Sequence, residues 1–256
     1  MSLLPLVTVV FATLVLALIA LNVRISIVTR EEAAPAGSQF PEIAFVPTFG
    51  LRVNDGALTW PTKPLPDSRL GAGKPNRQMF DRAVAERRLK TIYVQEAGWV
   101  AALEAGWRPD STDSDILTLP TEPGRFIKRF HKHSDAYSSP LPYDPGKPRP
   151  PYVDTVDCAV CALAIMREVN AQRAVIITHK QQMQRALWDF QWVCVSYFNG
   201  RFSFVPLTGS GEYDSLSYHP WTRNAMFYLP FELLFSRPKD LMRKWWGVSS
   251  SCVAPP

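Results

Sequence analysis

Residues 192–207 read WVCVSYFNGRFSFVPL, and this stretch decides the fold that the sequence predicts. Asn199 and Gly200 stand between two runs rich in β-branched and aromatic residues. This pair favours a type I′ turn, because both central positions of that turn need a positive φ. The pattern predicts an antiparallel β-hairpin with strands at 192–198 and 201–207. Both faces of the hairpin carry apolar side chains, so we expect it to be covered on both sides.

The chain before this hairpin predicts a buried helix and a buried strand. Residues 156–170 read VDCAVCALAIMREVN, and the Ala, Leu, Ile and Met in this run favour a largely buried helix. Residues 173–178 read RAVIIT, a β-branched run typical of a buried strand. Residues 179–190, HKQQMQRALWDF, fit either a helix or an extended surface loop.

Earlier segments add short helices and a strand. Residues 75–90 carry apolar side chains at helical spacing. Within residues 91–107, a second short helix that ends near Gly106 is predicted by Val100, Ala101, Leu103 and Glu104. Residues 116–120, ILTLP, predict a short strand. Together these elements predict an α+β domain at 76–226, with short helices and an antiparallel sheet that contains the hairpin.

The N-terminal run at residues 3–23 contains no charged residue and predicts a single transmembrane helix. At about 1.5 Å per residue it would be about 31 Å long, close to the thickness of the hydrocarbon core. A cleaved signal peptide is the alternative, but no Lys or Arg precedes the run. Arg24 and Arg30 follow it, so we expect the large domain on the cytoplasmic or matrix side.

Proline is frequent, with 23 residues, and it gathers in two stretches at 35–75 and 140–151. Aromatic residues lie among the prolines, which favours extended arms over disordered linkers. The C-terminal segment, residues 227–256, is aromatic and basic. It predicts a helix at the membrane interface or one packed on the domain core. The expected division of the chain is an anchor at 1–30, a Pro-rich arm at 31–75, the α+β domain at 76–226, and an interfacial helix with its tail at 227–256.

The residue composition argues against several kinds of site. The net charge is +5, but the charges are interspersed, so nucleic acid is not an expected partner. His131 and His133 are separated by one residue in a basic segment that we interpret as a solvated loop. A zinc site needs three or four ligands, so this pair alone does not predict one. Cys158 and Cys161 form a CxxC pair that we interpret as two buried thiols. The sequence therefore names no catalytic, cofactor-binding or metal-binding residue, and no cofactor.

Residues 157–207 resemble the core of the transglutaminase-like cysteine proteins. Asp157 and Cys158 look like the start of that family's helix, and the segment 190–192 looks like its His-x-Trp motif. The predicted hairpin follows where the family has one. The resemblance implies that Cys158 occupies the position of the nucleophile, at a helix start.

The sequence departs from this family at the other catalytic positions. Phe190 stands where the family has its histidine, and the acid position falls near Val205 or Pro206. His179 is the nearest candidate base in the sequence, although no motif places it beside the thiol. The resemblance therefore implies a related fold without catalysis.

Two hypotheses for the function follow. The first is a non-catalytic, single-pass accessory subunit of a membrane protein complex, such as a respiratory or photosynthetic electron-transport assembly. It would reside in a mitochondrial or bacterial inner membrane, with other subunits and the lipid bilayer as its partners. The alternative is a membrane-anchored thiol hydrolase or transferase of the transglutaminase-like type, or an inactive relative. The sequence leaves open whether the protein is an enzyme and favours a role without catalysis.

Overall fold

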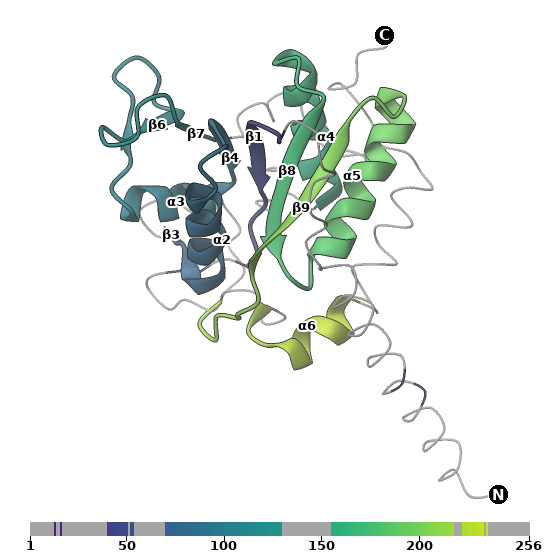
Figure 1. The fold of residues 1–256 in the computed structure, drawn as a ribbon. Helices are drawn as coiled ribbons and strands as arrows, with labels where there is room; N and C mark the ends of the chain where they lie inside the picture. The colour runs from purple at the N-terminus through teal and green to yellow at the C-terminus, as the bar shows by residue number, and fades with distance from the viewer. Residues whose placement is uncertain are drawn as a thin grey trace, which may run out of the picture.

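The computed structural model is a layered α/β domain in which a mixed seven-stranded sheet lies between helices on both of its faces (Figure 1). The strands of this sheet are β1 (Ile43–Val46), β4 (Thr91–Val94), β5 (Arg108–Pro109), β6 (Ile116–Thr118), β7 (Phe126–Arg129), β8 (Arg173–His179) and β9 (Ser203–Ser210). The helices are α2 (Gly73–Ala85), α3 (Glu96–Glu104), α4 (Thr155–Glu168), α5 (Met183–Phe198) and α6 (Ala225–Phe231). A small antiparallel pair is formed by β2 (Arg52–Val53) and β3 (Leu70–Gly71). The structure describes residues 13, 16, 40–50, 52–53, 70–129, 155–217, 222–232 and 234.

The strand order is β5-β6-β7-β4-β1-β8-β9, and the strands from β7 to β9 run parallel. β5 and β6 add an antiparallel edge beside β7. Successive strands from β1 through β4 to β7 are added on one side of β1, and β8 and β9 are then added on its other side. The order of the strands therefore reverses between β1 and β8, which makes this position the topological switch point of a doubly wound sheet.

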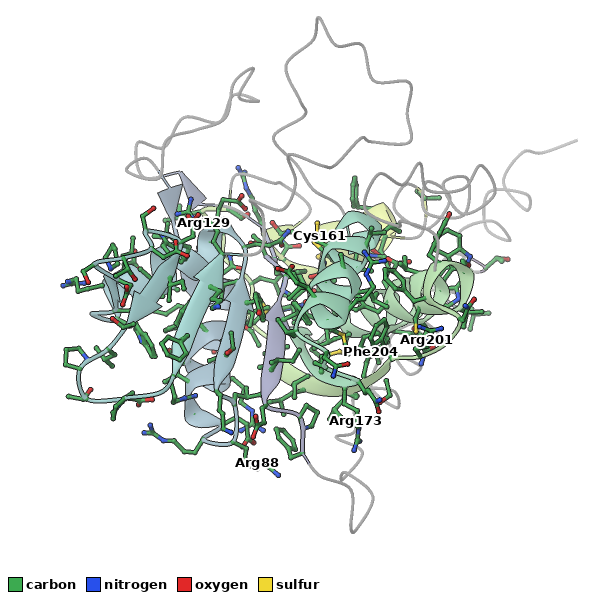
Figure 2. All side chains as sticks on the ribbon, turned by 90° about the horizontal axis from the view of Figure 1, so that it is seen from above. Arg88, Arg129, Cys161, Arg173, Arg201 and Phe204 are labelled. Atoms are coloured by element: carbon green, nitrogen blue, oxygen red, sulfur yellow. The ribbon has the colours of Figure 1, made fainter. Side chains whose placement is uncertain are left out.

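The central parallel strands β1, β4 and β8 are largely apolar on both faces, as strands covered by helices on both sides require. Ala44 and Val46 belong to the core on one face, which α2 and α3 cover. Phe45 belongs to the core on the other face, which α4 and α5 cover. Figure 2 shows the side chains that fill both layers, with Cys161 on the α4 side. Gly209 lets α2 approach β9, because a Cβ there would lie 2.7 Å from Met79 Cγ.

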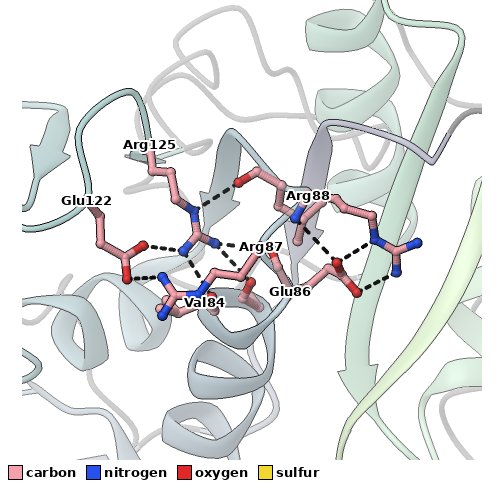
Figure 3. A network of polar contacts seen from close by, with 8 residues as sticks. Val84, Glu86, Arg87, Arg88, Glu122 and Arg125 are labelled. Atoms are coloured by element: carbon pink, nitrogen blue, oxygen red, sulfur yellow. Dashed lines mark hydrogen bonds and ion pairs between the residues drawn. The ribbon is translucent and has the colours of Figure 1, made fainter.

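Arg125 ties the end of α2 to the amino edge of the sheet (Figure 3). Its guanidinium donates to the carbonyl oxygens of Val84 and Leu89 at 2.9 Å and 3.0 Å, and it pairs with Glu122. A cation at the carboxyl end of a helix satisfies carbonyls that have no partner within the helix. This edge of the sheet is therefore held by a structural network.

The predicted hairpin is wrong. Residues 192–198 belong to α5, and the second predicted strand is β9, which pairs in parallel with β8. Buried residues recur along α5 at helical spacing, and Asn199 (φ 54°) and Gly200 (φ 67°) follow its last turn. The Asn-Gly pair supplies the positive φ values that are needed after the last turn of a helix. A type I′ turn needs positive φ values in the same way.

The expected α+β class with an antiparallel hairpin-containing sheet is also wrong, because the domain is α/β and its central strands are parallel. β1 lies in the middle of the sheet, within the range 31–75 that was expected to be a Pro-rich arm. Several elements are confirmed: the helices expected at 75–90, around 100–106 and at 156–170 correspond to α2, α3 and α4, and the strands expected at 116–120 and 173–178 correspond to β6 and β8. Residues 91–94, for which no strand was expected, form β4.

The expected transmembrane helix is not found among the residues that the structure describes, since none of their helices is long and apolar enough to cross a bilayer. Apart from Thr13 and Leu16, the predicted anchor at 3–23 lies outside those residues. The proline stretch at 140–151, the histidine pair at 131 and 133, and the C-terminal stretch from 235 onward also lie outside them.

Candidate functional site

The carboxyl ends of β1, β4 and β8 meet the start of α4 at the switch point of the sheet. In open α/β sheets, ligands bind outside the carboxyl ends of the strands at such a point. Thr48 follows β1, Gln95 follows β4, and Thr178 lies near the end of β8. α4 begins at Thr155, so its first turn brings Cys158 to the same edge.

Gln95 joins the first βα loop to the thiol of Cys158. Its Oε1 accepts a hydrogen bond from the Thr48 N–H, which fixes the orientation of the amide. Its Nε2 then donates to Cys158 Sγ at 2.9 Å. Both Gln95 and Cys158 are buried, with exposed fractions of 4% and 2%. The amide therefore holds the thiol in one position relative to β1.

A second set of hydrogen bonds joins α4 to the end of β8. Thr178 Oγ1 donates to Gln182 Oε1 at 2.9 Å, and Gln182 Nε2 donates to Thr155 Oγ1 at 3.5 Å. All three side chains are buried. Gln182 also precedes the first residue of α5, so this set connects three elements.

We call these six residues the polar set. They come from five segments, and each carries an uncharged polar group: Thr48, Gln95, Thr155, Cys158, Thr178 and Gln182. Burying such groups costs free energy unless they are hydrogen-bonded, and apolar residues would fill the same space without that cost. Thr48 Oγ1 is buried and has no hydrogen-bond partner in the described part of the chain. The polar set thus retains hydrogen-bonding capacity that the fold does not use.

His179 does not belong to the polar set. Its ring stacks on Phe49 with 3.8 Å between centroids, and Phe49 belongs to the core on the α2 face. Cys158 belongs to the core on the opposite, α4 face. The imidazole Nε2 lies 2.9 Å from the carbonyl oxygen of Glu212, and Nδ1 accepts from the Gln181 N–H. The candidate base from the sequence is therefore occupied on both nitrogens and separated from the thiol by the sheet.

Burial lowers the pKa of His179 from 6.5 to about 4, against the opposing effect of the Glu212 carbonyl. The unfolded chain binds this proton first as pH falls, so the folded state is stabilised in full above pH 6.5 and loses that advantage toward pH 4. We expect the loss to reach about 3 kcal/mol of unfolding free energy. Urea denaturation from pH 7 to pH 4 measures it. In His179→Gln the free energy of unfolding should depend less on pH, because this histidine no longer takes up a proton on unfolding. An unchanged pH dependence in the variant would contradict the lowered pKa of His179.

The transglutaminase-like resemblance relied on a hairpin that the structure does not have. Phe190 lies inside α5 and packs edge-on against Phe204, with 5.3 Å between ring centroids. Val205 and Pro206 lie within β9. Cys158 Sγ accepts a hydrogen bond from the Gln95 amide. Cys158 and Cys161 are both buried thiols, as expected from the sequence.

Comparisons with family models, with curated proteins and with solved structures found no match for this chain. The inference of function therefore depends on the geometry of the carboxyl edge. Sequence analysis singled out Cys158 in this region and missed Gln95 and Gln182. A polar residue directly after a buried apolar strand was the available signal for Gln95.

Proposed function

We propose that the domain binds a small, uncharged polar molecule at the carboxyl edge of its parallel sheet, between β1 and β8. The observation that carries the proposal is the buried polar set at the switch point. Its members are far apart in the chain, and strand order alone brings them together. A doubly wound sheet binds ligands at this place in proteins of many different functions.

The chemistry of the polar set indicates the class of ligand. Amide and hydroxyl groups both donate and accept hydrogen bonds, and none of the six side chains carries a formal charge at neutral pH. Such groups suit a ligand rich in hydroxyl or amide groups, such as a sugar or a nucleoside. Thr48 Oγ1 is the first candidate for a direct contact, because its hydrogen-bonding capacity is unused among the described residues.

Thermal unfolding of the protein with a compound panel tests the proposal. The panel contains the uncharged compounds adenosine, uridine, glucose and N-acetylglucosamine, each at 1 mM. A compound bound with a Kd of about 10 μM would add about 2.7 kcal/mol of stability. We expect at least one compound to raise the Tm of the wild type, and Gln95→Leu to remove most of that rise.

The control for this panel is Thr118→Val, which changes a half-buried hydroxyl on β6, away from the switch point. It should keep the ligand-dependent rise in Tm. A panel in which no compound raises the Tm contradicts the proposal, and so does a rise that survives in Gln95→Leu.

The thiol hydrolase or transferase remains an alternative proposal. Cys158 lies in the first turn of α4 and accepts a hydrogen bond, which suits a reactive thiol. The described residues supply no imidazole base to it, since His179 packs on the other face of the sheet. The binding role therefore has the stronger support.

The accessory-subunit hypothesis also stays a prediction. Met226 and Leu234 are large apolar residues with exposed fractions of 83% and 59%. Large exposed apolar residues can contribute to contact with a partner. Purification in a mild detergent tests the hypothesis: co-elution with a large complex supports it, and elution as a single chain contradicts it.

A further inference from the structure

The chain after β9 crosses the carboxyl edge of the sheet and leads to α6, which lies below β8 and β9 in the view of Figure 1. We call its two described stretches, residues 211–217 and 222–232, the strap. The far end of the strap is anchored to α5 by an ion pair between Glu232 Oε2 and Arg185 Nη1 at 2.7 Å. Glu232 is only 1% exposed, so this anchor is buried.

The strap lies directly on the loop that follows β1. Gly50 has φ +70°, and a Cβ at this position would lie 2.5 Å from Thr222 Oγ1 and 2.7 Å from Ser217 Oγ. Tyr228 packs on Phe49 with 5.3 Å between ring centroids. Close contact with the strap therefore requires glycine at position 50.

The same loop holds the polar set together. Thr48 directly precedes Phe49, and its N–H is the group that orients the amide of Gln95. Gln95 in turn donates to Cys158 Sγ. A continuous line of contacts thus runs from the strap through Phe49 and Thr48 to the thiol.

We propose that the strap is a closing device for the ligand site, and this inference rests on the proposed function for the identity of that site. While the Arg185–Glu232 pair holds the strap, it keeps residues 47–50 after β1 in place, and Thr48 keeps Gln95 on Cys158. Release of the strap removes the packing of Tyr228 on Phe49 and loosens residues 47–50, which Asn76 still holds from the side of α2. Gln95 then loses its orientation, and Cys158 becomes accessible.

Labelling of the native protein with N-ethylmaleimide tests the proposal, with the rate at each cysteine followed by peptide mass spectrometry. A buried thiol reacts only when the structure around it opens. Gly50→Ala places a methyl group against Thr222, and Glu232→Gln weakens the anchor. Gly200→Ala is the matched control, because Gly200 has φ +67° and a Cβ there meets nothing within 4 Å.

We expect Cys158 to react roughly tenfold faster in Gly50→Ala and in Glu232→Gln than in Gly200→Ala. Cys194 is a buried thiol on α5 and reports global opening, so its rate in Gly50→Ala should stay near the wild-type value. In Glu232→Gln, which also lowers global stability, its rate should rise less than that of Cys158. Equal Cys158 rates in Gly50→Ala and Gly200→Ala would overturn the proposal. Equal acceleration of Cys158 and Cys194 would also overturn it, because global unfolding then explains both.

The labelling needs no ligand, so its outcome is separate from that of the compound panel. If Cys158 is selectively exposed in the strap variants but no compound of the panel raises the Tm, the strap is supported and the binding function is contradicted. A bound compound with unchanged Cys158 labelling in both strap variants would support the binding function and overturn the strap.

Discussion

Arg185→Met is expected to lower the free energy of unfolding by about 3–5 kcal/mol. Arg185 and Glu232 form an ion pair between α5 and the strap, and both side chains are buried. Removing the guanidinium leaves the carboxylate of Glu232 buried without its cation. Urea denaturation at pH 7 measures the loss.

The double variant Arg185→Met, Glu232→Leu separates the cost of a lone charge from the net value of the pair. Replacing a buried ion pair with apolar residues of similar size is often neutral or stabilising. We therefore expect the double variant to recover most of the stability that Arg185→Met loses. A double variant as unstable as the single one would show that the lone carboxylate is not the cause.

Asn76→Leu is expected to cost about 3 kcal/mol or more, because it leaves several buried backbone groups without partners. Asn76 Oδ1 accepts from the Phe49 N–H at 2.8 Å. Its Nδ2 donates to the carbonyl oxygens of Phe49, Gly50 and Ala72 at 3.3, 3.1 and 2.8 Å. The side chain therefore fixes the β1–α2 loop from the side of α2.

Asn76→Asp provides the comparison for this variant. Aspartate keeps the acceptor for the Phe49 N–H and loses the donors to the three carbonyl groups. Aspartate also places an ionised carboxylate beside those carbonyl oxygens in a buried site, so chemical denaturation at pH 7 should show Asn76→Asp to be the less stable of the two variants. An Asn76→Leu protein within about 0.5 kcal/mol of the wild type would mean that the loop does not depend on this side chain.

The sequence predicts α2, α3 and α4 because their apolar spacing is a local property of the chain. Asn199-Gly200 misled the prediction because the pair supplies positive φ to either a hairpin turn or a helix end. The choice depends on what residues 192–198 pack against, and these residues lie in α5 beside α4 and β8. That packing is not local, so the short-range pattern does not reveal it.

The parallel sheet was missed for a related reason. β1 has four residues, IAFV, and Pro41 and Pro47 flank it closely. Among so many prolines, a strand of this length resembles part of an extended arm. Its place in the sheet follows from pairing with β4 and β8, whose residues lie roughly 50 and 130 positions further along the chain.

The candidate site was only partly predictable. Cys158 stood out because it begins an apolar helix, and the structure does place it in the first turn of α4. Gln95 and Gln182 carry no motif of their own. They become neighbours of Cys158 and Thr155 only once the strand order is known, because parallel strands bring their carboxyl ends to the same edge.

Ligand protection of Cys158 is the most direct test of the central claim, that the carboxyl edge between β1 and β8 binds a small polar molecule. The rate of N-ethylmaleimide labelling at Cys158 is measured with each compound of the panel, in the wild type and in Gln95→Leu. The account predicts that at least one compound slows labelling of Cys158 roughly tenfold in the wild type, and that Gln95→Leu removes most of this protection. A Cys158 rate that no compound changes, or an equal slowing in Gln95→Leu, would contradict it.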